Sequence, residues 1–270
     1  MYKNQCVSTV RVKNEEGIIG EKTLICENII EIAIENEESG QREAGTITCT
    51  PCDLKELVCG WLFSEGYIKN GSDMGHMTCS EKGCTLTVHV RITSSGQNPT
   101  MAGDESRCAT ISKKDFIGER NKWDSVIMRQ VYQMFREDPP LHAQTRAAHS
   151  CMIVRQGKIL QTLYRSEDAG RHSAMDKAIG WALLHNVDLS DCLLMTSGRI
   201  STRMATKAAR AGAGALAGKG TVTTEAVDIA DRCGMVLIGL VQEDSALWFK
   251  KTRNNSQNVG TATYNRGNIR

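Results

Sequence analysis

The sequence has no excess of charge of one sign, no long apolar run and no apolar segment at its N-terminus. Its 33 Lys and Arg residues are balanced by 31 Asp and Glu residues, so no global basic field indicates a nucleic-acid partner. No apolar run approaches the roughly 20 residues that cross a bilayer. Residues 1–5 lack the apolar core of a secretory signal. We therefore expect a cytoplasmic protein with neither a nucleic-acid nor a membrane partner.

Cysteine, by contrast, is abundant, with 11 residues spread along the whole chain. A cytoplasmic chain of this length does not need disulfides, because the compartment keeps thiols reduced. Several cysteines stand in apolar runs, such as Cys192 in Cys192-Leu193-Leu194-Met195. We expect most of them to be reduced thiols of the core.

The hydrophobic pattern predicts a smaller N-terminal α+β domain over residues 1–100, rich in strands. Residues 86–92 alternate as a half-buried strand should. A helix is predicted to start near Thr50, because Pro51 suits its first position and Asp53 follows Thr50 by three residues, as in a capping box. Residues 101–122 lack periodicity and predict a mobile loop, which carries Cys108. Residues 254–270 are expected to form a polar tail.

Strands and helices alternate from residue 123 to residue 253. A helix is predicted at 123–135 and a hairpin at 151–164. Further helices are predicted at 173–184, 201–211 and 224–232, and strands at 192–196 and 235–241. This alternation is typical of an α/β layered domain with a largely parallel sheet.

Three junctions that lead into predicted helices share one composition, at residues 167–172, 197–201 and 218–224. Each combines glycine with hydroxyl or basic side chains at a helix N-terminus. Open backbone N–H groups and the helix dipole favour an anion there, and ligands of open α/β sheets bind beyond the carboxyl ends of the strands. One such loop alone is an ordinary turn or cap, but three together predict a phosphate or pyrophosphate site.

His172 and Asp176 stand four residues apart and so share one face of a predicted helix. This spacing suits a metal, but no third ligand with recognisable spacing is nearby. A histidine held by a carboxylate beside the anion site is the more economical interpretation. We therefore predict no metal site.

The same segments resemble those of a known family. Residues 167–180, Glu-Asp-Ala-Gly-Arg-His-Ser-Ala-Met-Asp-Lys-Ala-Ile-Gly, resemble the signature EDVGRHNALDKxIG of the formate dehydrogenase accessory sulfurtransferases, the FdhD family. Residues 196–212 resemble its SSGRxSxExVxKAxxAG block, and residues 223–239 its APTxLAVxLAExxGLTLVGF block. Residues 51–67 are similar to SPxDLEELALGFLLSEGII, and His149 falls where the family has a histidine.

The resemblance implies a C-terminal domain with a layered fold similar to that of cytidine deaminases, and a homodimer. It implies a sulfurtransferase that takes sulfane sulfur from a cysteine desulfurase onto a loop cysteine, as a persulfide. It also implies delivery of that sulfur to the molybdenum (or tungsten) bis(molybdopterin guanine dinucleotide) cofactor, bound as a substrate and needed by formate dehydrogenase. A guanine nucleotide is expected to mimic this ligand.

The catalytic cysteine implied by the resemblance is Cys108. The residues expected to bind the cofactor are Asp168, Arg171, His172, Ser197, Arg199, Lys219, Thr223, Leu240, Val241, Gln242, Glu243, Asp244 and Ser245. Glu243 and Asp244 depart from a stretch that is often basic in relatives, and would repel a phosphate.

The cysteine loop departs from the family's CGxCG pattern. Cys108 matches the first cysteine, but Ile111 stands at the second and both glycines are gone. Arg107, Lys113 and Lys114 surround Cys108 with positive charge, which favours a reactive thiolate. Loss of the second cysteine leaves an alternative open: a non-catalytic binding protein or chaperone for the cofactor.

Cys49-Thr50-Pro51-Cys52 is a C-x-x-C with three possible roles. The two thiols are incidental, form a redox pair, or join Cys79 and Cys84 in a zinc site. Deaminase activity is not expected despite the implied fold, because the signatures H-x-E and P-C-x-x-C of the zinc deaminases are both missing.

Overall fold

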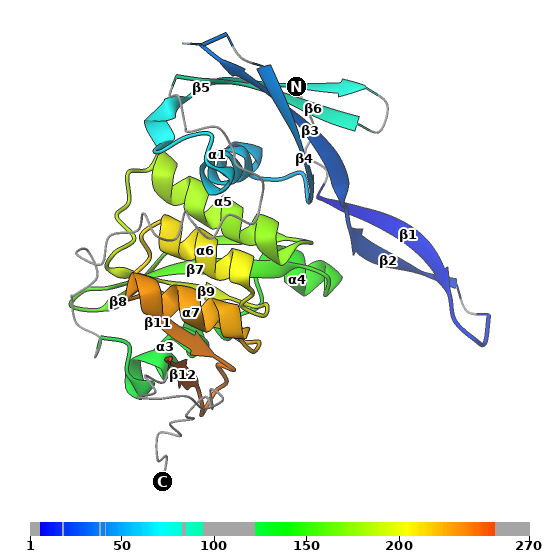
Figure 1. Cartoon of the computed structure of the whole chain (residues 1–270). Helices are drawn as coiled ribbons and strands as arrows, with labels where there is room; N and C mark the ends of the chain where they lie inside the picture. Colours follow the sequence, from blue (N-terminus) through cyan, green and yellow to red (C-terminus); the bar gives the residue numbers. More distant parts are fainter. Residues whose placement is uncertain are drawn as a thin grey trace. The chain divides into compact units, whose positions relative to one another are not determined.

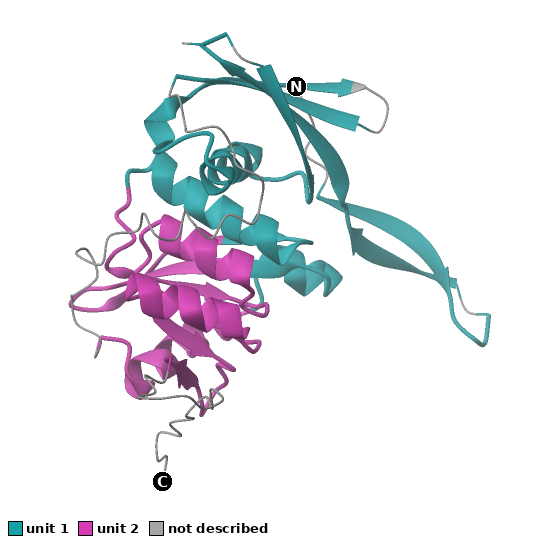
Figure 2. Cartoon of the chain, viewed as in Figure 1, with its two compact units in different colours: residues 1–99, 138–150, 166–186 teal, residues 100–137, 151–165, 187–270 magenta. Residues whose placement is uncertain are grey.

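A computed structural model describes residues 6–251, apart from residues 18, 38, 41, 83–84 and 94–121. Cys108 and the predicted 254–270 tail lie outside the described residues. The chain divides into two compact units (Figure 2). Unit 1 comprises residues 1–99, 138–150 and 166–186, and unit 2 comprises residues 100–137, 151–165 and 187–270. This division differs from the sequence prediction, which kept residues 123–253 together as one domain.

Unit 1 is built on a four-stranded sheet in the order β4-β3-β6-β5 (Figure 1). Strand β3 pairs in parallel with β6, whereas β4 and β5 add to the edges antiparallel. Side chains alternate along β3, where Ile30, Ile32 and Ile34 are buried on one face of the sheet. The bounds are β3 (Asn28–Asn36), β4 (Arg42–Cys49), β5 (Met74–Lys82) and β6 (Thr85–Ile92). A separate antiparallel ribbon joins β1 (Val7–Lys13) to β2 (Ile19–Ile25).

The helices of unit 1 explain why residues 166–186 belong to it. Helix α5 (Arg171–Leu184) packs against α1 (Leu54–Glu65) at two glycines. A Cβ on Gly180 would lie 1.8 Å from the carbonyl oxygen of Glu56, and one on Gly60 would lie 1.9 Å from that of Asp176. The two backbones therefore approach as closely as only glycine allows. The short helix α4 (Pro140–Thr145) and the 3-10 turn η1 (Gly71–Asp73) complete the unit.

Helix α1 begins at Leu54, so the predicted start near Thr50 was wrong. The residue before the helix, Asp53, has left-handed backbone angles (φ 50°, ψ 45°) and makes no capping hydrogen bond to the described residues. The capping box expected from Thr50 is absent because the Thr50 hydroxyl instead accepts from the N–H of Ala169 at 3.0 Å. A tertiary contact has taken the place of a local one.

Unit 2 is built on a six-stranded sheet in the order β12-β11-β10-β9-β7-β8, with the ends of β7 and β8 counted in unit 1. Strands β9, β10 and β11 are parallel, but β12 and β7 pair antiparallel with β11 and β9. The sheet is therefore mixed, and not largely parallel as predicted. The strands are β7 (His149–Gln156), β8 (Leu160–Asp168), β9 (Cys192–Thr196), β10 (Ala215–Gly218), β11 (Val236–Gly239) and β12 (Leu247–Phe249).

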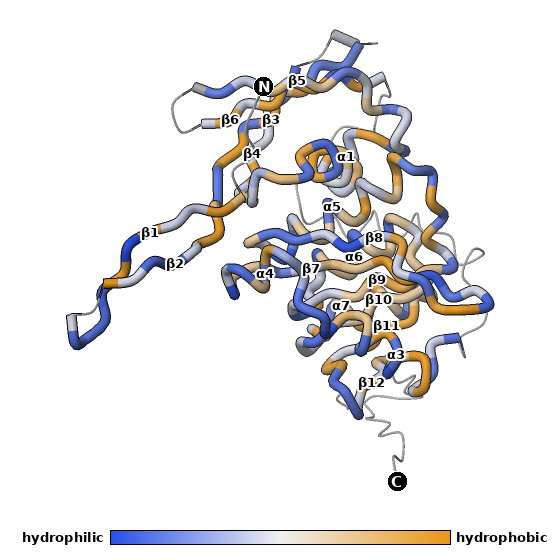
Figure 3. The backbone as a smooth tube through the Cα atoms, turned by 180° about the vertical axis from the view of Figure 1, so that it is seen from behind, coloured by the Kyte–Doolittle hydropathy of each residue, from blue (hydrophilic) through white to orange (hydrophobic). Residues whose placement is uncertain are grey.

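The described residues of unit 2 form three helices: α3 (Ser125–Arg136), α6 (Thr202–Arg210) and α7 (Thr224–Cys233). One buried cluster joins Met128, Val131 and Phe135 of α3 to alternate residues of the central strands, such as Leu193 and Met195. Figure 3 shows the central strands coloured mostly as hydrophobic, as expected of strands buried on both faces. None of the helices in the described parts of the chain is long and apolar enough to cross a bilayer.

Candidate functional site

A fully buried ion pair organises the junction between β8 and α5 in unit 1. The ammonium of Lys177 lies 2.8 Å from a carboxylate oxygen of Asp168, and both side chains are 0% exposed. Lys177 also donates to the carbonyl oxygens of Thr50 and Glu167, at 3.1 and 2.9 Å. The Asp168 carboxylate accepts from the N–H groups of Thr50 and Gly170, at 3.1 and 2.8 Å. Since its oxygens are occupied by these donors, Asp168 holds the junction in shape and is not exposed for the predicted contact with a ligand.

Burial and the neighbouring groups together raise the pKa of both members of the pair. Burial lowers the pKa of Lys177, but the carboxylate of Asp168 and the sulfur of Cys52 more than offset this, so the pKa of Lys177 ends above its ordinary value. Burial raises the pKa of Asp168, while Lys177 and the two backbone N–H groups oppose that rise. A buried charge is tolerated only with such partners.

Two other carboxylates of this segment connect elements of unit 1. Glu167 accepts from the N–H groups of Leu141 and His142, at 2.8 and 2.7 Å, and so caps the N-terminus of α4. Asp176 accepts from the hydroxyl of Ser64 on α1 at 2.8 Å. The predicted carboxylate support of His172 by Asp176 stays a prediction.

Arg171 and His172 form the first turn of α5, and His149 begins β7. Burial, followed by the positive charge of Arg171 and by His142, lowers the pKa of His149. The Nε of Arg171 is buried with no hydrogen-bond partner among the residues that the structure describes. A buried donor left open costs free energy, which is the condition expected of a group that serves a ligand.

In unit 2, three loops follow the carboxyl ends of β9, β10 and β11. We call residues 197–201, 219–223 and 240–245 the strand-end loops. Backbone hydrogen bonds tie neighbouring loops together: Gly220 donates to Gly198 at 3.2 Å, Ile200 donates to Thr221 at 2.9 Å and Leu240 donates to Gly220 at 3.0 Å. A parallel bridge between Ile200 and Val222 adds to them. The structure thus brings the predicted junctions at 197–201 and 218–224 together, whereas the junction at 167–172 belongs to unit 1.

The close approach of these loops depends on Gly220. A Cβ at this position would lie 2.8 Å from both the N and the Cα of Arg199. Arg199 and Lys219 are exposed, and Thr223 caps α7 by accepting from the N–H of Ala226 at 3.3 Å. Ser201 precedes α6, yet its hydroxyl makes no capping bond and is buried without a hydrogen-bond partner in the described chain. The first two strand-end loops therefore offer two cations and an unused hydroxyl.

The third strand-end loop fits its predicted role less well. Val241 is 1% exposed and belongs to the core cluster of unit 2, so only its backbone is available for contact with a ligand. Glu243 is paired with Arg136 of α3 at 2.8 Å, which neutralises one of the two acids that would repel a phosphate. Leu240, Gln242, Asp244 and Ser245 are exposed.

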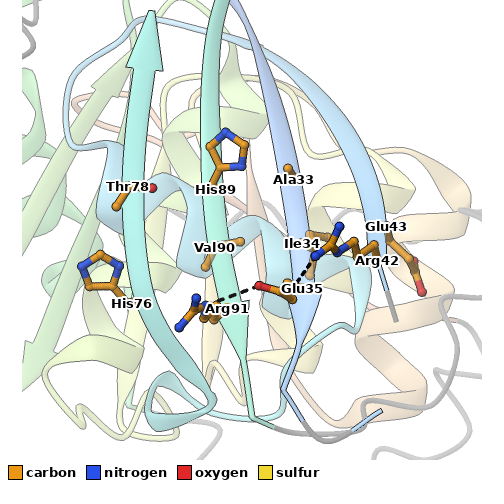
Figure 4. Close-up of a pocket in the computed structure, with 10 residues that line it drawn as sticks. All are labelled: Ala33, Ile34, Glu35, Arg42, Glu43, His76, Thr78, His89, Val90 and Arg91. Atoms are coloured by element: carbon orange, nitrogen blue, oxygen red, sulfur yellow. Dashed lines mark hydrogen bonds and ion pairs between the residues drawn. The ribbon is translucent and has the colours of Figure 1, made fainter. Parts of the chain in front are cut away.

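A cavity of about 960 Å³ lies elsewhere, on the four-stranded sheet of unit 1 (Figure 4). Its lining includes Glu35, which pairs with Arg42 at 3.1 Å and Arg91 at 3.4 Å. None of the predicted site residues in the described chain lines it. Glu35 and the two arginines therefore balance one another's charge at the surface of this sheet.

The cysteines of the described chain are reduced, with no disulfide among the nine of them. Cys49, Cys59, Cys151, Cys192 and Cys233 are buried, which confirms the prediction of core thiols. No three His, Cys, Asp or Glu side chains within the described residues could hold a metal ion. Cys49, Cys52 and Cys79 therefore form no such group, and the zinc alternative gains no support.

The fold and the strand-end loops define a mixed α/β protein with helix N-termini gathered at the ends of parallel strands, an arrangement typical of phosphate-binding sites. Residues 25–254 match the model of the FdhD/NarQ family, and the chain belongs to this family. The relationship suggested by the sequence motifs is thereby confirmed.

The relatives found by sequence and by structure support the same family assignment. The chain is 31% identical over 215 residues to the sulfur carrier protein FdhD of Geobacillus kaustophilus, covering 74% of this chain and 79% of the relative. It is 27% identical over 246 residues to the protein of that name from Sulfurisphaera tokodaii, covering 88% and 94%. A crystal structure described as a formate dehydrogenase accessory protein of Desulfotalea psychrophila has a similar fold, with a TM-score of 0.64 at 20% identity, covering 90% of this chain and 95% of that one.

Sequence reasoning missed the role of Lys177, although this residue stands within the quoted signature. A lysine in the middle of a helix is usually expected to be exposed to solvent. The structure shows instead that the side chain of Lys177 is 0% exposed. Thr50 was assigned to a helix cap, and its contacts with Ala169 and Lys177 bridge more than a hundred residues of sequence. No local signal could have shown this.

Proposed function

We propose that this protein is a sulfur carrier that accepts a persulfide sulfur on Cys108 from a cysteine desulfurase. It passes the sulfur to the molybdenum (or tungsten) bis(pterin guanine dinucleotide) cofactor of a formate dehydrogenase. The observation that carries the proposal is the family match over residues 25–254, together with relatives named sulfur carrier protein FdhD.

The first step is an exchange between two sulfur atoms. The thiolate of Cys108 attacks the outer sulfur of the desulfurase persulfide, a new S–S bond forms on Cys108, and the desulfurase sulfur leaves as a thiolate with the electron pair of the broken bond. Arg107, Lys113 and Lys114 favour the thiolate through their positive charge. Cys108 lies outside the described residues, so this step rests on sequence alone.

The strand-end loops of unit 2 would hold phosphate groups of the cofactor. Arg199 and Lys219 supply exposed positive charge, and the Ser201 hydroxyl is buried without a hydrogen-bond partner among the described residues. Polar groups in this condition fit an oxygen-rich ligand. We further propose that unit 2 keeps the cytidine-deaminase-like layering that the resemblance implies.

Sulfur transfer is tested with a cysteine desulfurase and cysteine. After incubation, peptide mass mapping should find one added sulfur atom on the peptide that contains residue 108. Cys108→Ala should abolish that gain, whereas the matched control Cys79→Ala, which removes an exposed thiol of β5, should keep it. Absence of sulfur on Cys108 in the parent protein would overturn the proposal.

The alternative is a non-catalytic carrier or chaperone of the cofactor. Its motivation is Ile111, which replaces the partner thiol of the family's loop. Calorimetric titration with GDP, as a mimic of the cofactor's nucleotide arm, separates the two. GDP binding without any persulfide on Cys108 would favour the carrier.

The proposal includes a homodimer. The β1–β2 ribbon exposes Val10, Val12, Ile19 and Leu24, and an isolated two-stranded ribbon is marginal in water. A second copy would cover this apolar surface. Light scattering should give the mass of two chains, and a mass of one chain would refute the dimer.

A further inference from the structure

Two partly exposed thiols meet in unit 1, outside the site described above. Cys52 lies in the turn between β4 and α1 (Figure 1), and Cys6 directly precedes β1. The chain at Cys6 is fixed because its carbonyl oxygen accepts from the N–H of Cys26 at 2.8 Å. A hydrogen bond joins the side chains of Cys6 and Cys52. The side chains of the two thiols are therefore neighbours.

A buried ammonium lies beside one of these sulfur atoms. The Nζ of Lys177 is 3.4 Å from the Sγ of Cys52, and the Lys177 side chain is 0% exposed. At this distance, and away from bulk water, a positive charge strongly attracts negative charge on sulfur. The Lys177 ammonium is thus placed beside any negative charge that develops on the Cys52 sulfur during a reaction.

The neighbouring thiols do not share this environment. Burial, and then the charge and hydrogen bond of Cys52, raise the pKa of Cys6 to about 12, so Cys6 keeps its proton. Burial also raises the pKa of Cys49, the other member of the C-x-x-C, which is 0% exposed. Cys6 is partly exposed and hydrogen-bonded to Cys52, whereas Cys49 is sealed in the interior. We therefore take Cys6, and not Cys49 of the sequence motif, as the partner of Cys52.

We propose that Cys52 is a second sulfur-accepting thiol of this protein and that Cys6 is its resolving thiol. The proposal extends the sulfur-carrier function proposed above and rests on it for the supply of sulfane sulfur. The site takes a persulfide or polysulfide as its substrate.

The reaction needs no external oxidant. The Cys52 thiolate attacks the terminal sulfur of the donor, an S–S bond forms on Cys52, and the donor leaves as a thiolate or a shortened polysulfide. Cys6 then attacks the Sγ of Cys52 while its proton passes to the terminal sulfur of the persulfide anion, and that sulfur leaves with the bonding electron pair as hydrosulfide. The two thiols are oxidised to a disulfide while one sulfane sulfur is reduced to sulfide.

The test uses the full-length chain with Cys108→Ala and inorganic polysulfide as the donor, so that its result does not depend on Cys108. Peptide mapping after thiol alkylation should find a Cys6–Cys52 disulfide, and an electrode should detect released sulfide. Adding Cys6→Ser should abolish both and leave a persulfide on Cys52. Cys79→Ser, at an exposed thiol of the same unit, should change neither result.

Cys52 should take up sulfur about tenfold faster than Cys79 in the same sample. Equal rates at the two thiols would overturn the proposal. A persulfide on Cys52 that gives no disulfide with Cys6 intact would overturn the assignment of Cys6. Sulfur uptake by Cys52 from polysulfide, together with no desulfurase-dependent sulfur on Cys108, would refute the proposed transfer to Cys108 and leave this second site intact.

Discussion

Unit 1 holds its β8–α5 junction with buried charged side chains, whereas unit 2 holds its strand-end loops with backbone hydrogen bonds. The Lys177–Asp168 pair is fully buried and fills the hydrogen-bonding capacity of the turn around it. The strand-end loops are joined through main-chain groups such as those of Gly198 and Gly220. Their side chains, Arg199 and Lys219 among them, remain exposed.

This difference separates stability from ligand binding. In unit 1 a side chain that shapes the junction cannot be removed without leaving a buried charge. In unit 2 the backbone keeps the loops in place, so side chains can change with little effect on folding. Substitutions in the two units should therefore affect different measurements.

The largest effect is expected from Lys177→Met, which leaves the Asp168 carboxylate buried without its cation. The free energy of unfolding should fall by about 3–5 kcal/mol, as measured by urea denaturation. Lys251→Met is the matched control, since its pair with Asp228 is a surface contact with Lys251 58% exposed, and it should cost less than about 1 kcal/mol. Equal losses would remove the contrast between buried and exposed charge.

The next effect should come from Gly180→Ala in α5. The added Cβ would meet the Glu56 carbonyl oxygen at 1.8 Å, so α1 and α5 must move apart. We expect a loss of about 1–3 kcal/mol, seen as a lower melting temperature. Gly20→Ala, where no described atom lies within 4 Å, should leave the melting temperature almost unchanged. A tolerated Gly180→Ala would show that this helix contact does not hold unit 1 together.

In unit 2 the expected loss is in affinity. Arg199→Ala should weaken GDP binding about tenfold, or about 1.4 kcal/mol, because an exposed cation of the strand-end loops is lost. The free energy of unfolding should change by less than about 0.5 kcal/mol. Calorimetric titration and urea denaturation measure the two quantities. A large loss of stability with unchanged affinity would show that Arg199 stabilises unit 2 and does not serve the ligand.

Ser201→Ala should raise the free energy of unfolding and lower the affinity for GDP. Its hydroxyl is buried without a partner in the described chain, so its removal should raise the free energy of unfolding of the ligand-free protein by up to about 1 kcal/mol. GDP should bind more weakly if the hydroxyl serves the ligand. Thermal melts with and without GDP would show both effects. Lower stability in the free protein would mean that the hydroxyl already has a structural partner.

The smallest effect concerns pH. Burial lowers the pKa of His149 below its ordinary value of 6.5, so the unfolded chain binds the proton more readily than the folded one. Stability should be complete above pH 6.5 and should fall as the pH drops from there to the folded pKa. Since the ring is partly exposed, the loss should stay below about 1 kcal/mol. His149→Gln should flatten this part of the stability curve.

The helices and strands that could be predicted from the sequence were those whose apolar residues form a clear periodic or continuous pattern. The helices at 125–136 and 171–184 and the strand at 192–196 lie close to their expected places. Strand β10 was missed because Ala215-Leu216-Ala217-Gly218 lacks the β-branched residues that mark a strand. Its identity as a strand comes from pairing with β9 and β11.

The candidate site also has some features that the sequence predicted and others that depend on tertiary contacts. Glycine, hydroxyl and basic residues at helix starts were enough to indicate the loops at 197–201 and 219–223, because the chemistry of a helix N-terminus is local. The burial of Val241 and the pairing of Glu243 with Arg136 could not be foreseen. Both depend on α3, which lies more than a hundred residues away in the chain.

By itself, the sequence determined the family, most of the strands and helices, and the loops that we propose for phosphate binding, since each depends on residues near one another in the chain. Only the tertiary structure decided that residues 166–186 join unit 1, that Lys177 is buried against Asp168, and that Cys6 and not Cys49 meets Cys52. Those outcomes depend on glycine-to-backbone contacts and on charges desolvated by distant segments. Neither leaves a periodic trace in the sequence.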